Sequence, residues 1–209
     1  MSSIKILWNK EGKWLFEPYR YENNRSIPTD ANKFLKNVFL TLDHIWEKQA
    51  LLLEFPDGRT INILDEFMSR NDKNLIIRDG EKNQYEGTRD IITFYDEVGS
   101  VFRKDLRKPW IKSNMGRNTA ASILAHYFIH AYHEQFVYEA YRARKNQRFP
   151  AWKVRYPHFP NQEEVLVTTD LGNQAIRKLG DDERQHYKRN YYPTKSPITQ
   201  EPASEGEVV

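Results

Sequence analysis

The stretch TDANKFLKNVFLTLDHIWEK, residues 29–48, predicts an amphipathic helix. Its large apolar residues recur at the 3.6-residue spacing that places side chains on one face of a helix. That face consists of Phe34, Leu35, Val38, Phe39, Leu42, Ile45 and Trp46. Thr29 or Asp30 can cap the first turn, because both side chains accept hydrogen bonds from free backbone N–H groups. A helix with one apolar face needs a second layer to cover it, and the neighbouring segments supply the candidates.

Short apolar segments separated by turn signals surround this helix. The segments IKILWNKEGKWLFEP (4–18) and ALLLEFPDGRTINILDEF (50–67) predict β-hairpins, with turns at Glu11-Gly12 and at PDGR. NLIIRD (74–79) and RDIITFYDE (89–97) predict two more strands on either side of a polar loop. The first half therefore predicts an antiparallel sheet with one helix packed across it, which is an α+β fold.

The second half predicts a long central helix followed by an extended arm. The helix is expected to begin near Asn118 or Thr119 and to continue to about Gln147. The arm RFPAWKVRYPHFPN, residues 148–161, contains three prolines, which favour an extended chain because proline lacks an N–H and fixes φ. The segment EEVLVTTDLGNQAIRKL, residues 163–179, predicts a short strand followed by a short helix.

Composition divides the chain into three regions. Residues 1–100 form the predicted sheet domain, and we expect the helical and basic region 101–190 to pack on it as one unit. Residues 191–209 have the polar, proline-containing composition of a flexible tail. No apolar run approaches the roughly 18 residues of a membrane span, and the N-terminus lacks the apolar core of a signal peptide. We therefore expect no membrane partner, no secretion, and a place in the cytoplasm or in a virion.

Basic charge is concentrated in residues 101–160, which carry 12 Lys and Arg against 3 Asp and Glu. Residues 1–100 carry 14 basic and 17 acidic side chains, and residues 161–209 carry 6 and 9. The basic residues alternate with Trp, Tyr and Phe, a mixture that binds phosphates and stacks on exposed bases. Protein interfaces use the same residue types, so nucleic acid and a protein partner both remain open. The candidate binding residues are Arg103, Lys104, Arg107, Lys108, Trp110, Lys112, Arg142, Arg144, Lys145, Arg148, Trp152, Lys153 and Arg155.

The central helix contains three closely spaced histidines, in the sequence ASILAHYFIHAYHE at 121–134. His126 and His130 have the i,i+4 spacing that lets two imidazoles share one metal ion, and Glu134 follows one turn later. These three residues are the candidate metal ligands. Zincin-type motifs place a glutamate directly after the first histidine, whereas Tyr127 stands there in this chain. The alternative is that the histidines border the core and are hydrogen-bonded but inert, and the aromatic-rich helix favours that reading.

The sequence favours an interaction protein over an enzyme. Aromatic residues make up 13% of the chain, which supports a real core, and the absence of cysteine excludes thiolate ligands and a cysteine nucleophile. No phosphate-binding loop, dinucleotide fingerprint or nucleophile elbow occurs, so no organic cofactor is predicted. We expect a non-enzymatic subunit of a macromolecular assembly, of the phage-like virion or ribonucleoprotein type, whose C-terminal arm contacts neighbouring proteins. The alternatives are a nucleic-acid-binding accessory protein that uses residues 101–160 and a metal-dependent enzyme centred on the histidine helix.

Overall fold

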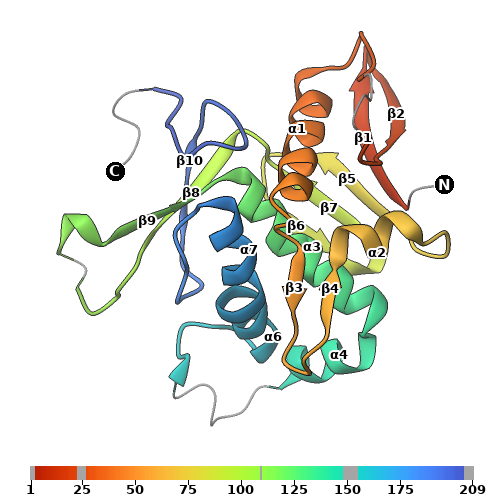
Figure 1. The fold of residues 1–209 in the computed structure, drawn as a ribbon. Coiled ribbons are helices and arrows are strands. Elements are labelled where there is room, and N and C mark those ends of the chain that lie inside the picture. Colours follow the sequence, from red (N-terminus) through yellow and green to blue (C-terminus); the bar gives the residue numbers. More distant parts are fainter. Residues whose placement is uncertain (1–2, 23–26, 109, 148–154, 205–209) are drawn as a thin grey trace.

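The computed structural model describes residues 3–22, 27–108, 110–147 and 155–204. Its largest sheet has the strand order β2-β1-β5-β7-β6 (Figure 1). The strands are β1 (Ile4–Lys10), β2 (Lys13–Pro18), β5 (Leu75–Asp79), β6 (Gln84–Glu86) and β7 (Ile91–Phe94). The predicted N-terminal hairpin is present, because β1 and β2 pair antiparallel around Glu11 and Gly12, both with positive φ. The pairs β1–β5 and β5–β7 are parallel, so the chain crosses over between the paired strands. The first connection contains helices, whereas the second contains β6 and a short 3-10 turn, Gly87–Arg89.

The predicted first helix is present as α1 (Lys33–Glu47), and it buries the expected apolar face apart from Trp46, which is half-buried. Its N-cap is Asn32 and not Thr29 or Asp30, since the Asn32 side chain accepts a hydrogen bond from the Leu35 N–H at 2.8 Å. Asp30 forms an ion pair with Lys10 instead. The hairpin β3 (Leu52–Glu54) and β4 (Thr60–Asn62) leads into α2 (Ile63–Ser69). The α+β class predicted from the sequence is confirmed.

The central helix α3 (Ala120–Phe136) contacts α1, α2 and β6 and is buried on nearly all sides. Thr119 caps it as predicted, because its hydroxyl accepts a hydrogen bond from the Ser122 N–H. The helix ends earlier than predicted, at Val137, where the backbone leaves the helical conformation before α4 (Tyr138–Asn146) begins. Lys73 donates a hydrogen bond to the Gln135 carbonyl at 2.7 Å, next to this break. No helix in the described ranges has the length and apolar character that crossing a bilayer requires.

The segment predicted as a strand and a helix is helical throughout. It forms α6 (Gln162–Val165), a π-helical stretch (Leu166–Leu171) and α7 (Gly172–Leu179). The run of Val and Thr residues suggested a strand, but Asn161 caps a helix here by accepting a hydrogen bond from the Glu164 N–H at 2.9 Å. These helices pack against α3, and that tertiary contact outweighs the local β-propensity. Half of the predicted arm, residues 148–154, lies outside the described residues.

A second sheet ties the C-terminal segment to the body of the molecule. It consists of β8 (Val98–Arg103), β9 (Met115–Asn118) and β10 (Asn190–Pro193), with β8 in the centre. Residues 191–204, which composition predicts to be flexible, continue from β10 through a bridge between Thr194 and Pro202. Asp181 connects this segment to the start of α3, because one of its oxygens accepts hydrogen bonds from Thr119 and Ser122 and the other accepts one from Gln200.

We expect Asp181→Ala to lower the free energy of unfolding by about 1–3 kcal/mol, because it removes a carboxylate from a helix N-terminus and leaves several donors without an acceptor. Urea unfolding followed by circular dichroism measures this change. Asp170→Ala, at an exposed position on the neighbouring π-helical stretch, is the control and should stay within about 0.5 kcal/mol of the wild type. Equal stability of both variants would show that Asp181 does not hold these segments together.

Candidate metal centre

His126 and His130 lie one turn apart on the buried face of α3 that meets α6. Their rings are 4.8 Å apart between centroids, and the two side chains are each 9% exposed. The i,i+4 spacing on a regular helix therefore brings both imidazoles to one point. Neither ring is simply buried among apolar groups, because both face carboxylates from the second helix.

Glu164 of α6 completes this cluster. One carboxylate oxygen lies 3.3 Å from His130 Nε2, and the other lies 3.7 Å from His126 Nε2. Each of the three residues offers one ligand atom, and these atoms all lie within 4.8 Å of one another. Two atoms that bind zinc tetrahedrally at about 2.0–2.1 Å are about 3.3 Å apart, so the spacing fits a shared ion. Glu164 Oε2 is buried and has no hydrogen-bond partner among the described residues.

Glu163, the residue before Glu164, faces the Nδ1 atoms of His130 and His133. One of its oxygens lies 2.5 Å from His133 Nδ1 and 3.6 Å from His130 Nδ1. The other accepts a hydrogen bond from Arg144 Nε at 2.6 Å, and the Glu163 side chain is only 2% exposed. Metal-binding histidines commonly place a carboxylate on the ring nitrogen that does not bind the ion. Glu163 is in position for that role towards His130.

Burial and charge act in opposite directions on this cluster. Burial lowers the pKa of His126 well below its usual value, and the neighbouring His130 lowers it further. Burial also lowers the pKa of His130, but the charge of Glu164 and hydrogen bonds to both glutamates outweigh it and raise that pKa to about 9. Burial raises the pKa of Glu163 and Glu164, but the histidines outweigh this effect and lower both. The glutamates are thus ionised and His126 is neutral near pH 7, as metal ligands must be. The raised pKa keeps His130 protonated at pH 7 without an ion, so binding of a metal ion would displace this proton.

The cluster opens onto a cavity of about 240 Å³, whose wall includes both histidines and both glutamates. Tyr127, Tyr187 and Arg189 also line this cavity. Tyr127 occupies the position where zincin motifs carry a glutamate base. Its hydroxyl donates a hydrogen bond to the Asn83 carbonyl at 2.6 Å, and burial raises its pKa. Three ligands beside an open cavity are typical of catalytic zinc sites, whereas structural sites are closed by four.

Glu134, the third ligand candidate from the sequence, does not join the cluster. Its carboxylate points to Gly87, where an added Cβ atom would lie 1.8 Å from Oε2. The structure therefore brings together His126, His130 and Glu164. The sequence does contain a sign that Glu164 lies on a helix, because Asn161 and Glu164 have the spacing of a helix capping box. This sign was missed because the segment was predicted to be a strand.

The basic–aromatic residues are spread over separate parts of the molecule and several have local partners. Lys104 pairs with Asp182, and Arg107 pairs with Asp105. Arg144 binds Glu163, and Lys145 donates to the Tyr141 hydroxyl. The guanidinium of Arg155 lies over the Tyr156 ring, and Arg142 is exposed on α4. Arg148, Trp152 and Lys153 lie outside the described residues.

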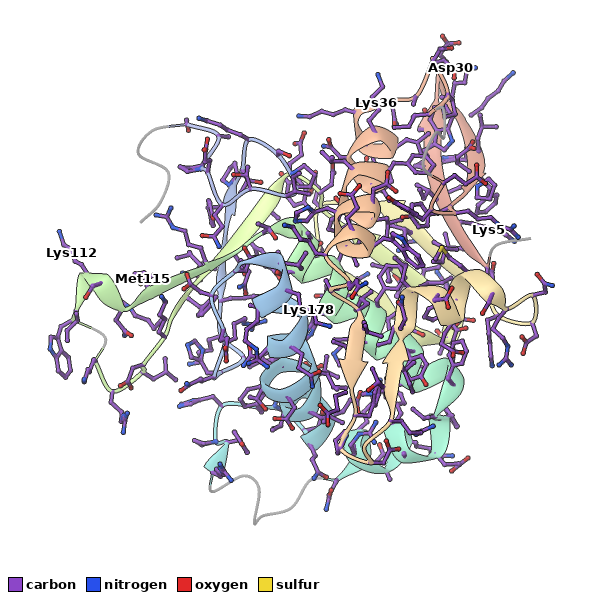
Figure 2. The ribbon with its side chains drawn as sticks, viewed as in Figure 1. Lys5, Asp30, Lys36, Lys112, Met115 and Lys178 are labelled. Atoms are coloured by element: carbon purple, nitrogen blue, oxygen red, sulfur yellow. The ribbon has the colours of Figure 1, made fainter. Side chains whose placement is uncertain are left out.

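The remaining basic–aromatic candidates lie on β8 and on the loop between β8 and β9. Arg103 lines a second cavity, while Lys108, Trp110 and Lys112 are exposed, with Trp110 at 75%. Figure 2 shows the labelled Lys112 on a loop that projects from the body of the molecule. α4 lies on a different side (Figure 1), so the described residues of the two basic segments do not form one continuous surface.

Comparison of the sequence with family models, and of the chain with curated proteins and solved structures, gave no significant match. The chemistry of the site therefore rests on its own geometry.

Proposed function

We propose that this protein binds one divalent metal ion, zinc in the first place, through His126, His130 and Glu164, and uses it in hydrolysis. The observation that carries the proposal is the convergence of three ligand atoms around a buried carboxylate oxygen that has no hydrogen bond. Two imidazoles and one carboxylate are the ligand set of several catalytic zinc sites. Non-haem iron(II) uses the same set, and metal analysis separates the two ions.

The cavity supplies the remaining requirements of such a reaction. A divalent ion held by His126, His130 and Glu164 would polarise a carbonyl or phosphoryl oxygen and would lower the pKa of a bound water. Glu163 is held by Arg144 and His133, and from its place 3.6 Å from His130 Nδ1 it can orient that ring. Arg189 provides a positive charge in the cavity wall, where it can stabilise negative charge that develops on a reacting oxygen. Because Tyr127 is not a base, activation of water depends on the ion more than in zincins.

The open coordination position gives a direct test. Cobalt(II) added to the metal-free full chain should give the intense visible absorption of a four- or five-coordinate site, and added azide should change that spectrum. The azide occupies the position that faces the cavity. Glu164→Gln should weaken cobalt binding by at least about tenfold, because it removes a charged ligand. A spectrum that remains that of the hydrated ion, or one that azide leaves unchanged, would contradict an open three-ligand centre.

A second proposal, nucleic-acid binding, rests on the β8–β9 loop, where Trp110 is 75% exposed beside Lys108 and Lys112. Aromatic stacking together with phosphate contacts suits single strands. The variant Lys108→Glu, Lys112→Glu should weaken binding of a single-stranded oligonucleotide by about tenfold or more and reduce its salt slope by about 1.4. Arg142→Glu on α4 is the control. Absence of binding by the intact chain at low salt would end this proposal.

We also propose the predicted role as an assembly subunit, because three adjacent apolar residues of the edge strand β2, Trp14, Leu15 and Phe16, are exposed.

A further inference from the structure

A cavity of about 690 Å³ adjoins the metal centre. It shares four wall residues with the smaller cavity of the cluster, namely Asn83, Tyr127, Tyr187 and Arg189. The two cavities are therefore neighbouring parts of one depression, with Tyr127 and Arg189 between them. A molecule bound in the larger part would extend towards His126 and His130.

The larger cavity is positively charged. Arg103, Lys188 and Arg189 line it, and none of the residues that form its wall is acidic. Within the described part of the chain, none of these three cations forms an ion pair with a carboxylate. Arg189 contacts the Tyr127 hydroxyl at 3.4 Å and lies over the Tyr191 ring at 5.3 Å. Three cations without carboxylates around one cavity favour an anionic ligand.

We infer that this cavity binds the anionic group, a carboxylate or a phosphate, of the substrate on which the metal centre acts. This inference rests on the proposed function for its catalytic meaning. The binding of the anion itself does not require the metal ion. The rings of Tyr187 and Tyr191 supply apolar walls for the part of the substrate next to the anion. Arg189, which lines both cavities, lies where that part enters the metal centre.

Isothermal titration calorimetry on the metal-free full chain tests the assignment, with inorganic phosphate and succinate as ligands at low ionic strength. We expect saturable binding of at least one of them. Arg189→Met and Arg103→Met should each weaken it by about tenfold, since each removes a charge-assisted hydrogen bond. Arg142→Met, an exposed arginine on α4, should leave it unchanged. Tighter binding of phosphate would indicate a phosphorylated substrate, and tighter binding of succinate would indicate a carboxylate.

Lack of binding by both anions, or equal losses in Arg142→Met, would overturn the anion site. Zinc binding by the same protein is measured separately. A chain that binds zinc but neither anion loses only this inference, and a chain that binds an anion but no metal loses only the proposed metal centre.

A second, independent inference concerns β2, the outermost strand of the five-stranded sheet. Trp14 and Phe16 are 59% and 55% exposed, and Leu15 between them is 40% exposed. Glu11 and Gly12 form a two-residue turn, so the backbone N–H and C=O groups of Lys10 and Lys13, which flank it, point towards each other. Alternation along an antiparallel ladder then turns the N–H and C=O groups of Trp14 and Phe16 outward.

The geometry points to β2 as a pairing edge for a second copy of this chain. In an antiparallel pair with its two-fold axis at Leu15, Trp14 of each copy lies opposite Phe16 of the other, and these two residues exchange backbone hydrogen bonds. The same register places Lys13 opposite Glu17, so the charges of the strand complement each other. Pro18 has no N–H to donate and ends the edge.

Light scattering during size-exclusion chromatography, over a range of concentrations, tests this pairing. The wild type should reach twice the mass of the chain. Glu17→Lys places like charges opposite each other at both ends of the pair and should weaken dimerisation by about tenfold. The exchange Lys13→Glu, Glu17→Lys restores opposite charges and should restore the dimer. A wild type that stays monomeric, or an exchange variant that dimerises no better than Glu17→Lys, would overturn the inference.

Discussion

The double variant His126→Ala, His130→Ala is expected to lose zinc binding, with an apparent affinity at least about 10³-fold below that of the wild type. The reason is that His126 and His130 supply two of the three ligand atoms of the site, so that only Glu164 remains in the variant. Substitution of a residue that hydrogen-bonds to a metal ligand lowers metal affinity by about 10–100-fold. The loss of two ligands should lower the affinity further. Competition with a fluorescent zinc chelator measures the affinities.

Thermal unfolding gives a second measure of the same loss. Zinc at about 100 times its dissociation constant should stabilise the wild type by about 2.7 kcal/mol, whereas it should not stabilise the double variant. His158→Ala, at an exposed position outside the cluster, is the control and should bind zinc like the wild type. Equal zinc affinities in the double variant and the control would show that the histidine helix is not the metal site.

Glu163→Ala should lower the free energy of unfolding by about 3–5 kcal/mol in the presence of chelator. The substitution leaves Arg144, and a protonated His130, without the carboxylate that they share, and removal of one partner from a buried ion pair has costs of this size. Chemical denaturation followed by circular dichroism measures the change. The double variant Glu163→Ala, Arg144→Met should recover part of the loss, because it also removes the charge that was left without a partner.

Glu183→Ala is the matched control for this variant. Glu183 pairs with Arg177 at 3.0 Å, but both side chains are about half exposed, and such pairs contribute about 0–1 kcal/mol. If Glu163→Ala is as stable as Glu183→Ala, then Glu163 does not hold the cluster together.

The sequence predicted the features that depend on local spacing. The buried face of α1 followed from apolar residues at helical intervals, and the hairpin of β1 and β2 followed from its turn. The parallel pairing of β1 with β5 did not, because it depends on contacts between segments some 70 residues apart. Whether two strands pair in parallel depends on how the chain between them crosses over.

The sequence also predicted only that part of the candidate site which depends on local spacing. His126 and His130 were recognised because their spacing is local, whereas Glu164 comes from a second helix. The Val and Thr residues that follow Glu164 favoured a strand, so the carboxylates were placed outside any site. Glu134 was chosen as the third ligand because it is on the same helix as the histidines, although its side chain points to Gly87.

We propose that one divalent ion binds between α3 and α6. Calorimetric titration of zinc into the chelator-treated full chain, with metal content measured on the recovered protein, tests it most directly. We expect saturation at one zinc ion per chain in the wild type and a strong loss of affinity in Glu164→Ala. A wild type that takes up no zinc, or a Glu164→Ala variant that binds zinc with unchanged affinity, would contradict it.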